Sequence, residues 1–583
     1  MLVSPHLADL QPAAELWRST LWQVSELVEL LQECQAKEIM KAIVADPKVL
    51  SILNKRKGQK GWRELQGDNL KDVLLSVIQT EEELLHELDH HLTDARLSYP
   101  RFFFLSDSDL IDLLAHPSDR HQWVPFIRKL FPGIREVTLA LTSDPYGIQS
   151  QLDLQLHADK LGAVAVRGDL NEDIKLVRPV AATSSLCKWW SSFEVSVKST
   201  VGSILQACLE ARLQDGASGN PEAILEELAS FEGSAGYTEE QQDLKQAVKK
   251  SFSHWLLRFP SQCVLVGEAV LWFRQMEKVL KGGDKEDLEK ARDKLQKRLS
   301  QYTGVLRDNV RQYLNSPSRA RLHILLSNLL MQTLHHRDIV EGLLKLSNVD
   351  NTTFDWQKAL RYSMDISTTI CVHNKKEAHG STSVETQYLF GLCHVNQLRS
   401  SFPYDYEYLG PALRLVSTPL TERCHLALTN AMKGFECGTV LGQSSSGKTE
   451  SVKDLSQAMG RNLLIVECTG INNVRTLNSL LCGMIQTGSW GLLENPQSMG
   501  QGLMSVLAQQ LQHIVHAYQV LHNEKYDDTY SRRGKSTVKH LRRHSVTTLH
   551  PVSSDVIPKS AKEVREKIFI TARVSFYKYS MNE

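Results

Sequence analysis

The chain has 583 residues, and its 67 Lys and Arg are balanced by 67 Asp and Glu, so its formal net charge is zero. This balance excludes the strongly basic field that attracts nucleic acids or anionic membranes. The length is enough for several domains with large buried cores. A hydrophobic content of 42% and a charged content of 23% are typical of a soluble globular protein.

The ten cysteines are scattered, with no C-x-x-C pair and no His/Cys cluster at metal-ligand spacing. That pattern favours a reducing compartment and free thiols over a disulfide framework. Residues 1–6 lack the charged and apolar regions of a secretory signal, and no apolar run approaches the roughly 20 residues of a membrane span. We therefore expect an intracellular, soluble chain that binds neither nucleic acid nor membrane.

Helical periodicity dominates residues 16–346. Breaks rich in small residues at 215–221, 233–236 and 282–284 predict turns between helices. A strand-like patch near residues 137–180 predicts a small β insertion. We expect residues 1–400 to form an elongated, mostly helical body. The clearest apolar stripe, with charged residues on the opposite face, consists of Leu288, Ala291, Leu295, Leu299, Tyr302 and Leu306.

An α/β pattern follows in residues 401–520, where apolar strands alternate with helices. Such alternation predicts a parallel sheet covered on both faces, although the sheet looks incomplete. Residues 521–583 are basic and are interpreted as a solvated, partly disordered tail with one β-prone run at 568–576. The expected strands are 413–417, 437–441, 463–468 and 490–493, and the expected helices are 421–433, 450–459, 474–487 and 504–518.

The most specific motif is the segment Gly442-Gln443-Ser444-Ser445-Ser446-Gly447-Lys448-Thr449, which fits the phosphate loop G-x-x-x-x-G-K-[ST]. It stands between a predicted buried strand and a predicted helix, as such a loop requires. Backbone N–H groups of the loop and the positive end of the helix bind phosphates. We expect Lys448 to reach the β- and γ-phosphates of ATP and the Thr449 hydroxyl to hold Mg²⁺. The alternative is a Gly/Ser-rich turn that happens to precede a lysine.

Ordered blocks of the chain resemble the dynein heavy chain family. The segment Arg96-Leu97-Ser98-Tyr99-Pro100-Arg101-Phe102-Phe103-Phe104-Leu105-Ser106 is similar to the linker motif FPRFYFLS, and His336-Arg337-Asp338-Ile339-Val340 to the element ARDVV. The segments Tyr406-Glu407-Tyr408-Leu409-Gly410 and Arg414-Leu415-Val416-Ser417-Thr418-Pro419 resemble the start of the first AAA+ module. The resemblance implies a mainly α, elongated linker followed by a partial α/β P-loop (AAA+) domain with a parallel sheet. It also implies that Leu415 and Val416 lie against the adenine.

The phosphate loop departs from the family pattern at two positions. The family usually has Pro after the first Gly and another Gly three residues on, where this chain has Gln443 and Ser445. If the backbone at Ser445 needs a positive φ, a serine there costs roughly 1–2 kcal/mol. We therefore expect weakened rather than abolished nucleotide binding.

A larger departure lies in the second nucleotide motif, which the family reads as FDEFN, with Asp near Mg²⁺ and Glu polarising the attacking water. By resemblance, Glu494 stands at the Asp position and Asn495 at the Glu position. Glu494 could still serve the metal together with Thr449, or it could be a solvated carboxylate at a strand end. Asn495 cannot accept a proton, so general-base assistance worth roughly 10²–10⁴ in rate should be missing. The sequence leaves open whether the chain is an ATPase.

Three functions stay open at this point. The first is a dynein-type subunit that binds ATP, is associated with microtubule-based movement and is impaired in hydrolysis. It is not an autonomous motor, because the family's later modules, stalk and microtubule-binding tip have no residues here. The second is a non-hydrolysing nucleotide-binding scaffold on which other dynein subunits dock. The third is a P-loop kinase, for which no lid arginines or acceptor-site aspartate can be identified.

The resemblance also implies partners and a location. The partners would be dynein intermediate and light intermediate chains, with microtubules bound only indirectly. The location would be the cytoplasm and its cytoskeleton, or the axoneme of a cilium or flagellum.

Overall fold

The computed structural model describes residues 69–115, 123–141, 161–181, 185–213, 239–310, 316–364, 392–471, 473–530 and 570–575, together with a few isolated positions before residue 26 and residue 224. The chain divides into two compact units, Met1–Ala95 and Arg96–Glu583. The first unit contains most of the helix α4 (Asn69–Ser98), on which exposed His90 pairs with Asp94 at 3.1 Å. All features below belong to the second unit.

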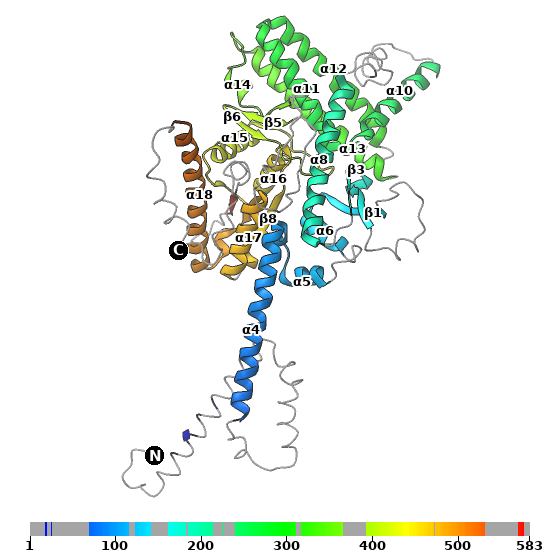
Figure 1. Ribbon diagram of the computed structural model, residues 1–583. Coiled ribbons are helices and arrows are strands. Elements are labelled where there is room, and N and C mark those ends of the chain that lie inside the picture. The colour runs from blue at the N-terminus through cyan, green and yellow to red at the C-terminus, as the bar shows by residue number, and fades with distance from the viewer. Residues whose placement is uncertain are drawn as a thin grey trace, which may run out of the picture. The chain divides into compact units, whose positions relative to one another are not determined.

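Helices dominate the part before residue 360, as the periodicity predicts (Figure 1). The apolar stripe expected around Leu288 lies on α12, where Leu288, Leu295 and Tyr302 are buried. Gly283 (φ 74°) ends α11 in the left-handed conformation, with its N–H donating to the carbonyl of Val279 at 3.2 Å, which confirms the turn at 282–284. The turns expected at 215–221 and 233–236 lie outside the described residues. The helices are α5 (Asp107–Ala115), α6 (Val124–Leu130), α8 (Leu186–Leu213), α10 (Glu239–Arg258), α11 (Ser261–Gly282), α12 (Lys285–Val310), α13 (Pro317–Leu344) and α14 (Phe354–Gln357).

Two small antiparallel sheets accompany these helices. The first, with strand order β1-β2-β3, contains β1 (Ile134–Leu141), β2 (Leu161–Gly168) and β3 (Asp173–Val180), and it confirms the predicted β insertion. The second contains β4 (Arg361–Met364), β5 (Cys393–Gln397) and β6 (Ser400–Pro403), and the sequence did not predict it. Its strands have only four or five residues, too few for a period of two to stand out.

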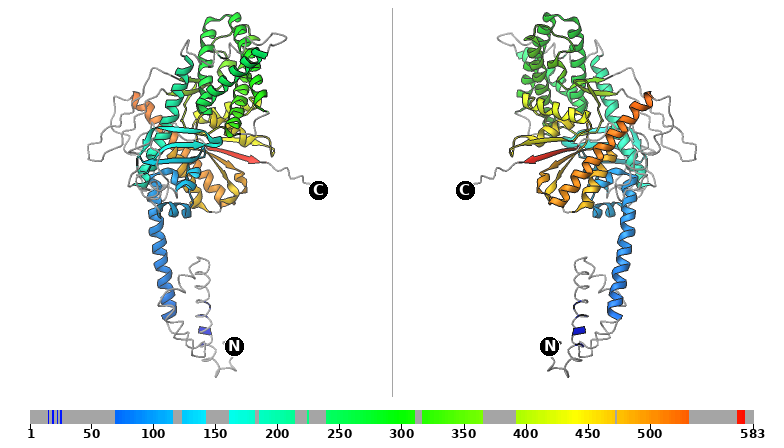
Figure 2. Two further views of the ribbon diagram at one scale, coloured as in Figure 1. Left: turned by 90° about the vertical axis from the view of Figure 1, so that its right-hand side faces the viewer. Right: turned by 90° about the vertical axis from the view of Figure 1, so that its left-hand side faces the viewer.

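The α/β part contains a four-stranded sheet with the order β7-β10-β9-β8, in which every neighbouring pair is parallel. Figure 2 shows β10, drawn in red, lying along the other strands of this sheet. The expected elements are confirmed within one to three residues at most ends. They are α15 (Pro419–Lys433), β7 (Gly438–Gly442), α16 (Lys448–Ala458), β8 (Leu463–Glu467), α17 (Val474–Thr487), β9 (Trp490–Glu494), α18 (Gln501–Tyr530) and β10 (Ile570–Ser575).

Three details differ from the expectation. Residues 413–417 were expected to form a strand, but they run without a strand partner, and the N–H groups of Arg414 and Leu415 donate to the side chains of Asn328 and Asp454 instead. The strand β7 was expected to be buried, but it lies at an edge of the described sheet and exposes Leu441. The helix α18 continues to Tyr530, so residues 521–530, which were expected to belong to the basic tail, are helical. The domain boundaries at 400 and 520 stay proposals.

The two parts of the second unit share a core around the short 3₁₀ helix η3 (Pro100–Phe104). Phe104 packs against an apolar cluster of the α/β part that includes Leu477, Leu481 and Met484. On α17, Gly483 makes this contact possible, because a Cβ there would lie 2.7 Å from side-chain atoms of both Phe103 and Phe104. The linker motif is therefore seated directly on α17.

No single helix among the described residues is long and apolar enough to cross a membrane. The segments Ala247–Arg258 and Ser261–Gly282 pass such a test only as a pair, and the chain bends by 102° between them. Twelve residues of α11 are buried inside the protein, including Trp272 and Phe273, as expected for a core helix.

Candidate functional site

The phosphate loop lies between β7 and α16, as the sequence predicts. Residues 443–447 are exposed and connect Gly442, the last residue of β7, with Lys448, the first residue of α16. The backbone is left-handed at Ser445 (φ 59°) and at Gly447 (φ 81°) but not at Ser446 between them. Alternation of this kind turns successive N–H groups toward one point and forms a concave site for anions.

Ser445 therefore has the positive φ that was the condition for strain at this position. Its φ of 59° is positive, and a residue with a side chain is strained there by roughly 1–2 kcal/mol relative to glycine. Ser446 compensates in part by donating a hydrogen bond from Oγ to the carbonyl of Gln443 at 2.9 Å. The loop is thus held in its curved conformation by its own side chains.

The ammonium group of Lys448 lies at the centre of the loop. Its side chain is only 4% exposed. Nζ donates to the carbonyl of Gly442 at 2.8 Å, to the carbonyl of Gln443, and to Oγ of Ser446 at 3.4 Å. The positive end of α16 points at the same place, so the loop concentrates positive charge where phosphates would bind.

Thr449 and Glu494, the two residues predicted to serve a metal, are in direct contact. The hydroxyl of Thr449 donates to Oε1 of Glu494. Glu494 is the last residue of β9 and pairs in register with Glu467 of β8 and Arg573 of β10. Because the carboxyl ends of parallel strands meet at one edge of a sheet, this edge lies beside the phosphate loop.

No group of three or more His, Cys, Asp or Glu suited to a metal occurs in the described part of the chain. A divalent ion at this edge would therefore depend on the Thr449 hydroxyl, the Glu494 carboxylate and oxygens of its own ligand. Hard oxygen donors of this kind suit Mg²⁺, which keeps several waters and phosphate oxygens in its shell.

Asn495, which stands at the position of the family's water-polarising Glu, is committed to other contacts. Its backbone is left-handed (φ 51°), a conformation that Asn tolerates better than most residues. Its side-chain Nδ2 donates to Oε1 of Glu467 at 3.2 Å, and its carbonyl accepts from the N–H and Oγ of Ser498. The side chain provides an amide where proton abstraction needs a base.

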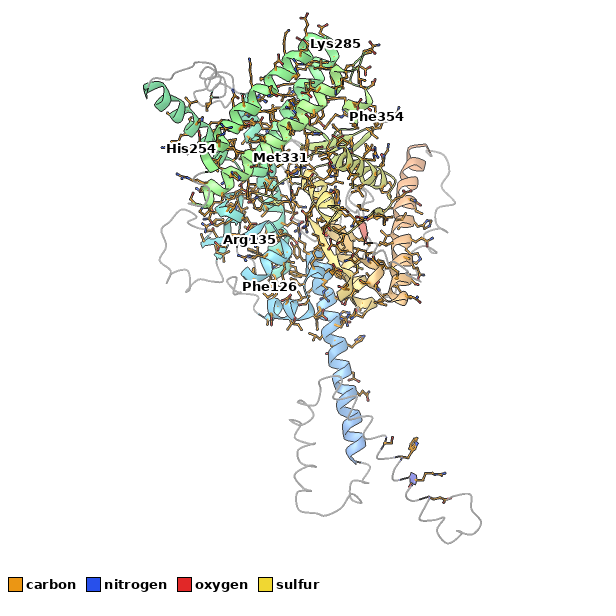
Figure 3. The ribbon with its side chains drawn as sticks, turned by 180° about the vertical axis from the view of Figure 1, so that it is seen from behind. Phe126, Arg135, His254, Lys285, Met331 and Phe354 are labelled. Atoms are coloured by element: carbon orange, nitrogen blue, oxygen red, sulfur yellow. The ribbon has the colours of Figure 1, made fainter. Side chains whose placement is uncertain are left out.

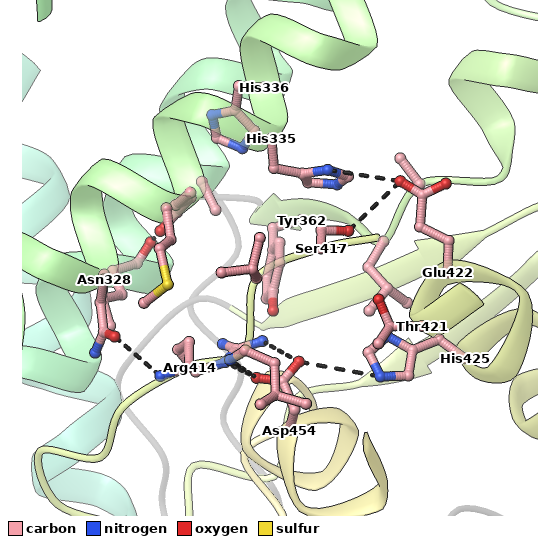
Figure 4. A pocket seen from close by; sticks show the side chains of 18 of the residues that line it. Asn328, His335, His336, Tyr362, Arg414, Ser417, Thr421, Glu422, His425 and Asp454 are labelled. Carbon is pink, nitrogen blue, oxygen red and sulfur yellow. Dashed lines mark hydrogen bonds and ion pairs between the residues drawn. The ribbon is translucent and has the colours of Figure 1, made fainter. Parts of the chain in front are cut away.

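Leu415 and Val416, which the resemblance places against adenine, are 36% and 54% exposed. They line a cavity of about 130 Å³ (Figure 4). Met331 of α13, labelled in the view from behind in Figure 3, lines the same cavity. Lys448 and Thr449 do not line it. The structure therefore brings together the residues of the phosphate loop and Glu494, whereas Leu415 and Val416 lie on a separate segment.

A buried network of charges was missed by the sequence analysis. Arg101 is 2% exposed and donates to Glu407 at 2.9 and 2.8 Å, and to Glu194 at 3.0 and 2.9 Å. Burial opposes the ionisation of Glu194, but Arg101 and Lys198 outweigh it and lower the pKa of Glu194 to about 2. An arginine inside an aromatic run was the available signal, because a buried cation needs a buried partner.

The parallel sheet, the phosphate loop at the end of β7 and the Thr449–Glu494 pair define a P-loop module joined to a helical body. Two family models match the chain: "Dynein heavy chain, N-terminal region 2" over residues 35–208 and "Hydrolytic ATP binding site of dynein motor region" over residues 404–528. The chain belongs to the dynein heavy chain family, with a helical linker followed by a partial AAA+ domain.

Individual relatives agree with the family models. The chain is 31% identical to Dynein heavy chain domain-containing protein 1 of Homo sapiens over 502 residues, which is 85% of this chain and 10% of the relative. It is 29% identical to the Mus musculus protein of the same name over 493 residues (84% and 10%), and 25% identical to the cytoplasmic dynein heavy chain of Dictyostelium discoideum over 520 residues (88% and 9%). The chain thus spans about a tenth of the length of these relatives.

Proposed function

We propose that this chain is the linker and nucleotide-binding part of a dynein-type heavy chain, which binds ATP with Mg²⁺ but hydrolyses it poorly. The observation that carries the proposal is the curved loop between β7 and α16, with the buried ammonium of Lys448 at its centre. Bound phosphates would accept hydrogen bonds from the loop N–H groups. They would also accept from the ammonium group of Lys448, which donates to the loop carbonyls of Gly442 and Gln443 in the structure. The loop residues in this role are Gly442, Gln443, Ser444, Ser445, Ser446, Gly447, Lys448 and Thr449.

The metal ion fits the donors present at the edge of the sheet. Thr449 would coordinate Mg²⁺ through its hydroxyl, and Glu494 would hold it directly or through a bound water. When bound, the ion would neutralise charge on the β- and γ-phosphates. The hydrogen bond between the Thr449 hydroxyl and Glu494 supports a shared role for these two groups.

Impaired hydrolysis follows from the chemistry of Asn495. An amide can orient a water molecule but cannot remove its proton at neutral pH, whereas a carboxylate in its place can. The side-chain amide of Asn495 also donates a hydrogen bond to Glu467, and this contact supports a fixed orientation of the amide. Loss of general-base assistance lowers the rate of hydrolysis by a factor of roughly 10²–10⁴.

The wider role is proposed at the level of the family. Dynein heavy chains act in microtubule-based movement and bind other dynein subunits, and relatives of this chain include cytoplasmic and axonemal heavy chains. We infer association with the cytoskeleton, in the cytoplasm or in a cilium or flagellum. Docking of intermediate and light intermediate chains on the linker helices, with only indirect contact to microtubules, is part of this proposal.

Equilibrium binding and steady-state hydrolysis, measured on the same purified chain, test the proposal. We expect ATP and ADP to bind, Lys448→Ala to abolish binding, and turnover to stay far below the order of one per second that ordinary enzymes reach. Turnover near that rate that depends on Lys448 would instead indicate an active motor-type site. Phosphate transfer to a small acceptor would indicate a kinase.

A further inference from the structure

The edge of the sheet beside the phosphate loop carries a second carboxylate, that of Glu467, the last residue of β8. Glu467 pairs in register with Glu494 of β9, and neighbouring strands of a sheet lie about 4.8 Å apart. Because registered residues of neighbouring strands project to the same face of a sheet, the two carboxylates lie on one face. Glu467 is therefore one strand away from the residue that contacts Thr449.

Two other carboxylates close to the loop are engaged by partners of their own. Glu494 accepts from the hydroxyl of Thr449, the group proposed to hold the metal. Glu450, in the first turn of α16, is paired with the ammonium group of Lys453 at 2.7 Å. Glu467 has neither a metal-binding neighbour nor a cation as its partner among the side chains that the structure describes. It is the carboxylate at this edge that can serve a water molecule.

The exposed carboxylate of Glu467 is held by two neutral donors. Nδ2 of Asn495 donates to its Oε1 at 3.2 Å, and the hydroxyl of Thr469 donates to the same oxygen at 3.5 Å. Oε2 of Glu467 and Oδ1 of Asn495 accept no hydrogen bond from the part of the chain that the structure describes. An amide oxygen can accept from one O–H of a water molecule while a carboxylate oxygen accepts from the other. The pair therefore offers one water molecule both an orienting group and a proton acceptor.

We propose that Glu467 is the general base for the slow hydrolysis of ATP by this chain, and that it acts on a water molecule oriented by the amide of Asn495. The proposal rests on the proposed function of the phosphate loop. The water oxygen forms a bond to the γ-phosphorus, and the bond from that phosphorus to the oxygen bridging the β- and γ-phosphates breaks. One water proton passes to the carboxylate of Glu467, which later releases it to solvent, and the products are ADP and inorganic phosphate.

The position of Glu467 also accounts for slow rather than absent turnover. A general base acts on a proton within hydrogen-bond reach, and its contribution falls when it is displaced from the best position. Glu467 belongs to β8, whereas Asn495 directly follows β9, so the carboxylate is displaced by one strand from position 495. The chain thus keeps part of the base assistance that the amide at position 495 cannot give.

Single-turnover hydrolysis at saturating ATP, measured together with the affinity for ATP, tests the role of Glu467. Glu467→Gln keeps the size of the side chain and the acceptor for Asn495 but cannot take a proton. We expect the rate constant to fall roughly tenfold or more, with an affinity within about twofold of the wild type. The matched control is Glu450→Gln, which removes an exposed carboxylate that is paired with Lys453 and should change neither quantity by more than about twofold.

Chemical rescue separates proton transfer from a structural role. In Glu467→Ala, added formate, a small carboxylate, should restore part of the lost rate, whereas chloride at the same ionic strength should not. In the Asn495→Glu background the new carboxylate takes the proton, so a further Glu467→Gln change should slow hydrolysis much less than it does in the wild type.

Three results would overturn the role of Glu467: the same rate in the wild type and in Glu467→Gln, the same loss in both backgrounds without rescue by formate, or a wild-type chain that binds ATP with no measurable turnover. If the wild-type chain binds no ATP, the proposed function fails as well, and the binding measurement distinguishes this outcome from the other three.

Discussion

The guanidinium of Arg101 donates to both carboxylate oxygens of Glu407, at 2.9 and 2.8 Å, although the two residues are 306 positions apart in the chain. Arg101 belongs to the linker motif and Glu407 to the first segment of the AAA+ module. Both side chains are buried, and Glu194 of α8 accepts from the same guanidinium. The base of the linker is thus joined to the AAA+ module by a buried, bidentate ion pair.

Loss of this pair should strongly destabilise the second unit. Arg101→Ala would leave Glu194 and Glu407 buried without their main partner, and breaking a buried pair in this way costs about 3–5 kcal/mol. Chemical denaturation, followed by tryptophan fluorescence because Trp189 and Trp190 are buried nearby, would measure the change in the free energy of unfolding. The control is Arg135→Ala, which removes a half-exposed pair with Asp169 and should cost less than about 1 kcal/mol. Equal effects of the two substitutions would contradict this assignment.

Ser445→Gly should strengthen nucleotide binding. Glycine adopts the φ of 59° at this position without strain, so the curved loop would be more populated before the ligand arrives. We expect roughly fivefold tighter ATP binding, equivalent to about 1 kcal/mol, in isothermal titration calorimetry. Ser444→Gly, at a neighbouring position whose φ is not positive, should bring no such gain. A gain in both variants, or in neither, would argue against strain at Ser445.

Asn495→Glu should restore part of the missing chemistry. A carboxylate at this position can accept the proton of an attacking water, and we expect ATP turnover to rise by about 10²-fold. Steady-state release of phosphate would measure it. In the control Asn495→Gln, the new side chain has almost the same size as Glu but no basic group, so the rate of ATP turnover should stay at the wild-type level. Similar rates in the Glu and Gln variants would show that residue 495 does not limit hydrolysis.

The stability of the protein should fall in mild acid because of buried histidines. Burial lowers the pKa of His336 well below 6.5, and the nearby His335 and Arg298 lower it further. His336 is therefore neutral in the folded protein, while in the unfolded chain it gains a proton as the pH falls below about 6.5. The unfolded state then binds more protons, so this residue alone reduces stability by up to about 1.4 kcal/mol per pH unit.

Denaturation midpoints at pH 7.5 and 5.5 test this effect. The variant His336→Phe keeps a ring that can stack on Trp272, which lies 3.7 Å from His336 between ring centroids. It should lose less stability between the two pH values than the wild type does. An equal loss would mean that His336 is not the source.

Local sequence patterns predicted most elements of the fold. The apolar stripe that begins at Leu288 predicted α12, and the phosphate loop predicted both β7 and α16, because these signals lie within one turn or one motif. Residues 413–417 were wrongly predicted to form a strand, because the N–H groups of Arg414 and Leu415 are bonded by the side chains of Asn328 and Asp454 instead of a neighbouring strand. Local sequence cannot reveal a partner that comes from a distant helix.

The candidate site was predictable to the same degree. The motif and the resemblance identified the loop residues and, separately, Thr449 and Glu494 as candidates for holding a metal, but they did not predict the contact between these two side chains. The pairing of Arg101 with Glu407 did not, because a separation of 306 positions leaves no periodic trace. The sequence could not show whether the φ of Ser445 is positive, and only the backbone of the structure shows that it is.

The fate of ATP bound to the purified chain tests the central claim most directly. The wild-type chain and Lys448→Ala would be incubated with ATP and Mg²⁺, freed of excess nucleotide, and analysed over time for protein-bound ATP and ADP. We predict that the wild type retains nucleotide that stays largely ATP over many minutes, and that Lys448→Ala retains none. A wild-type chain that retains no nucleotide, or that converts it to ADP within seconds, would contradict the account.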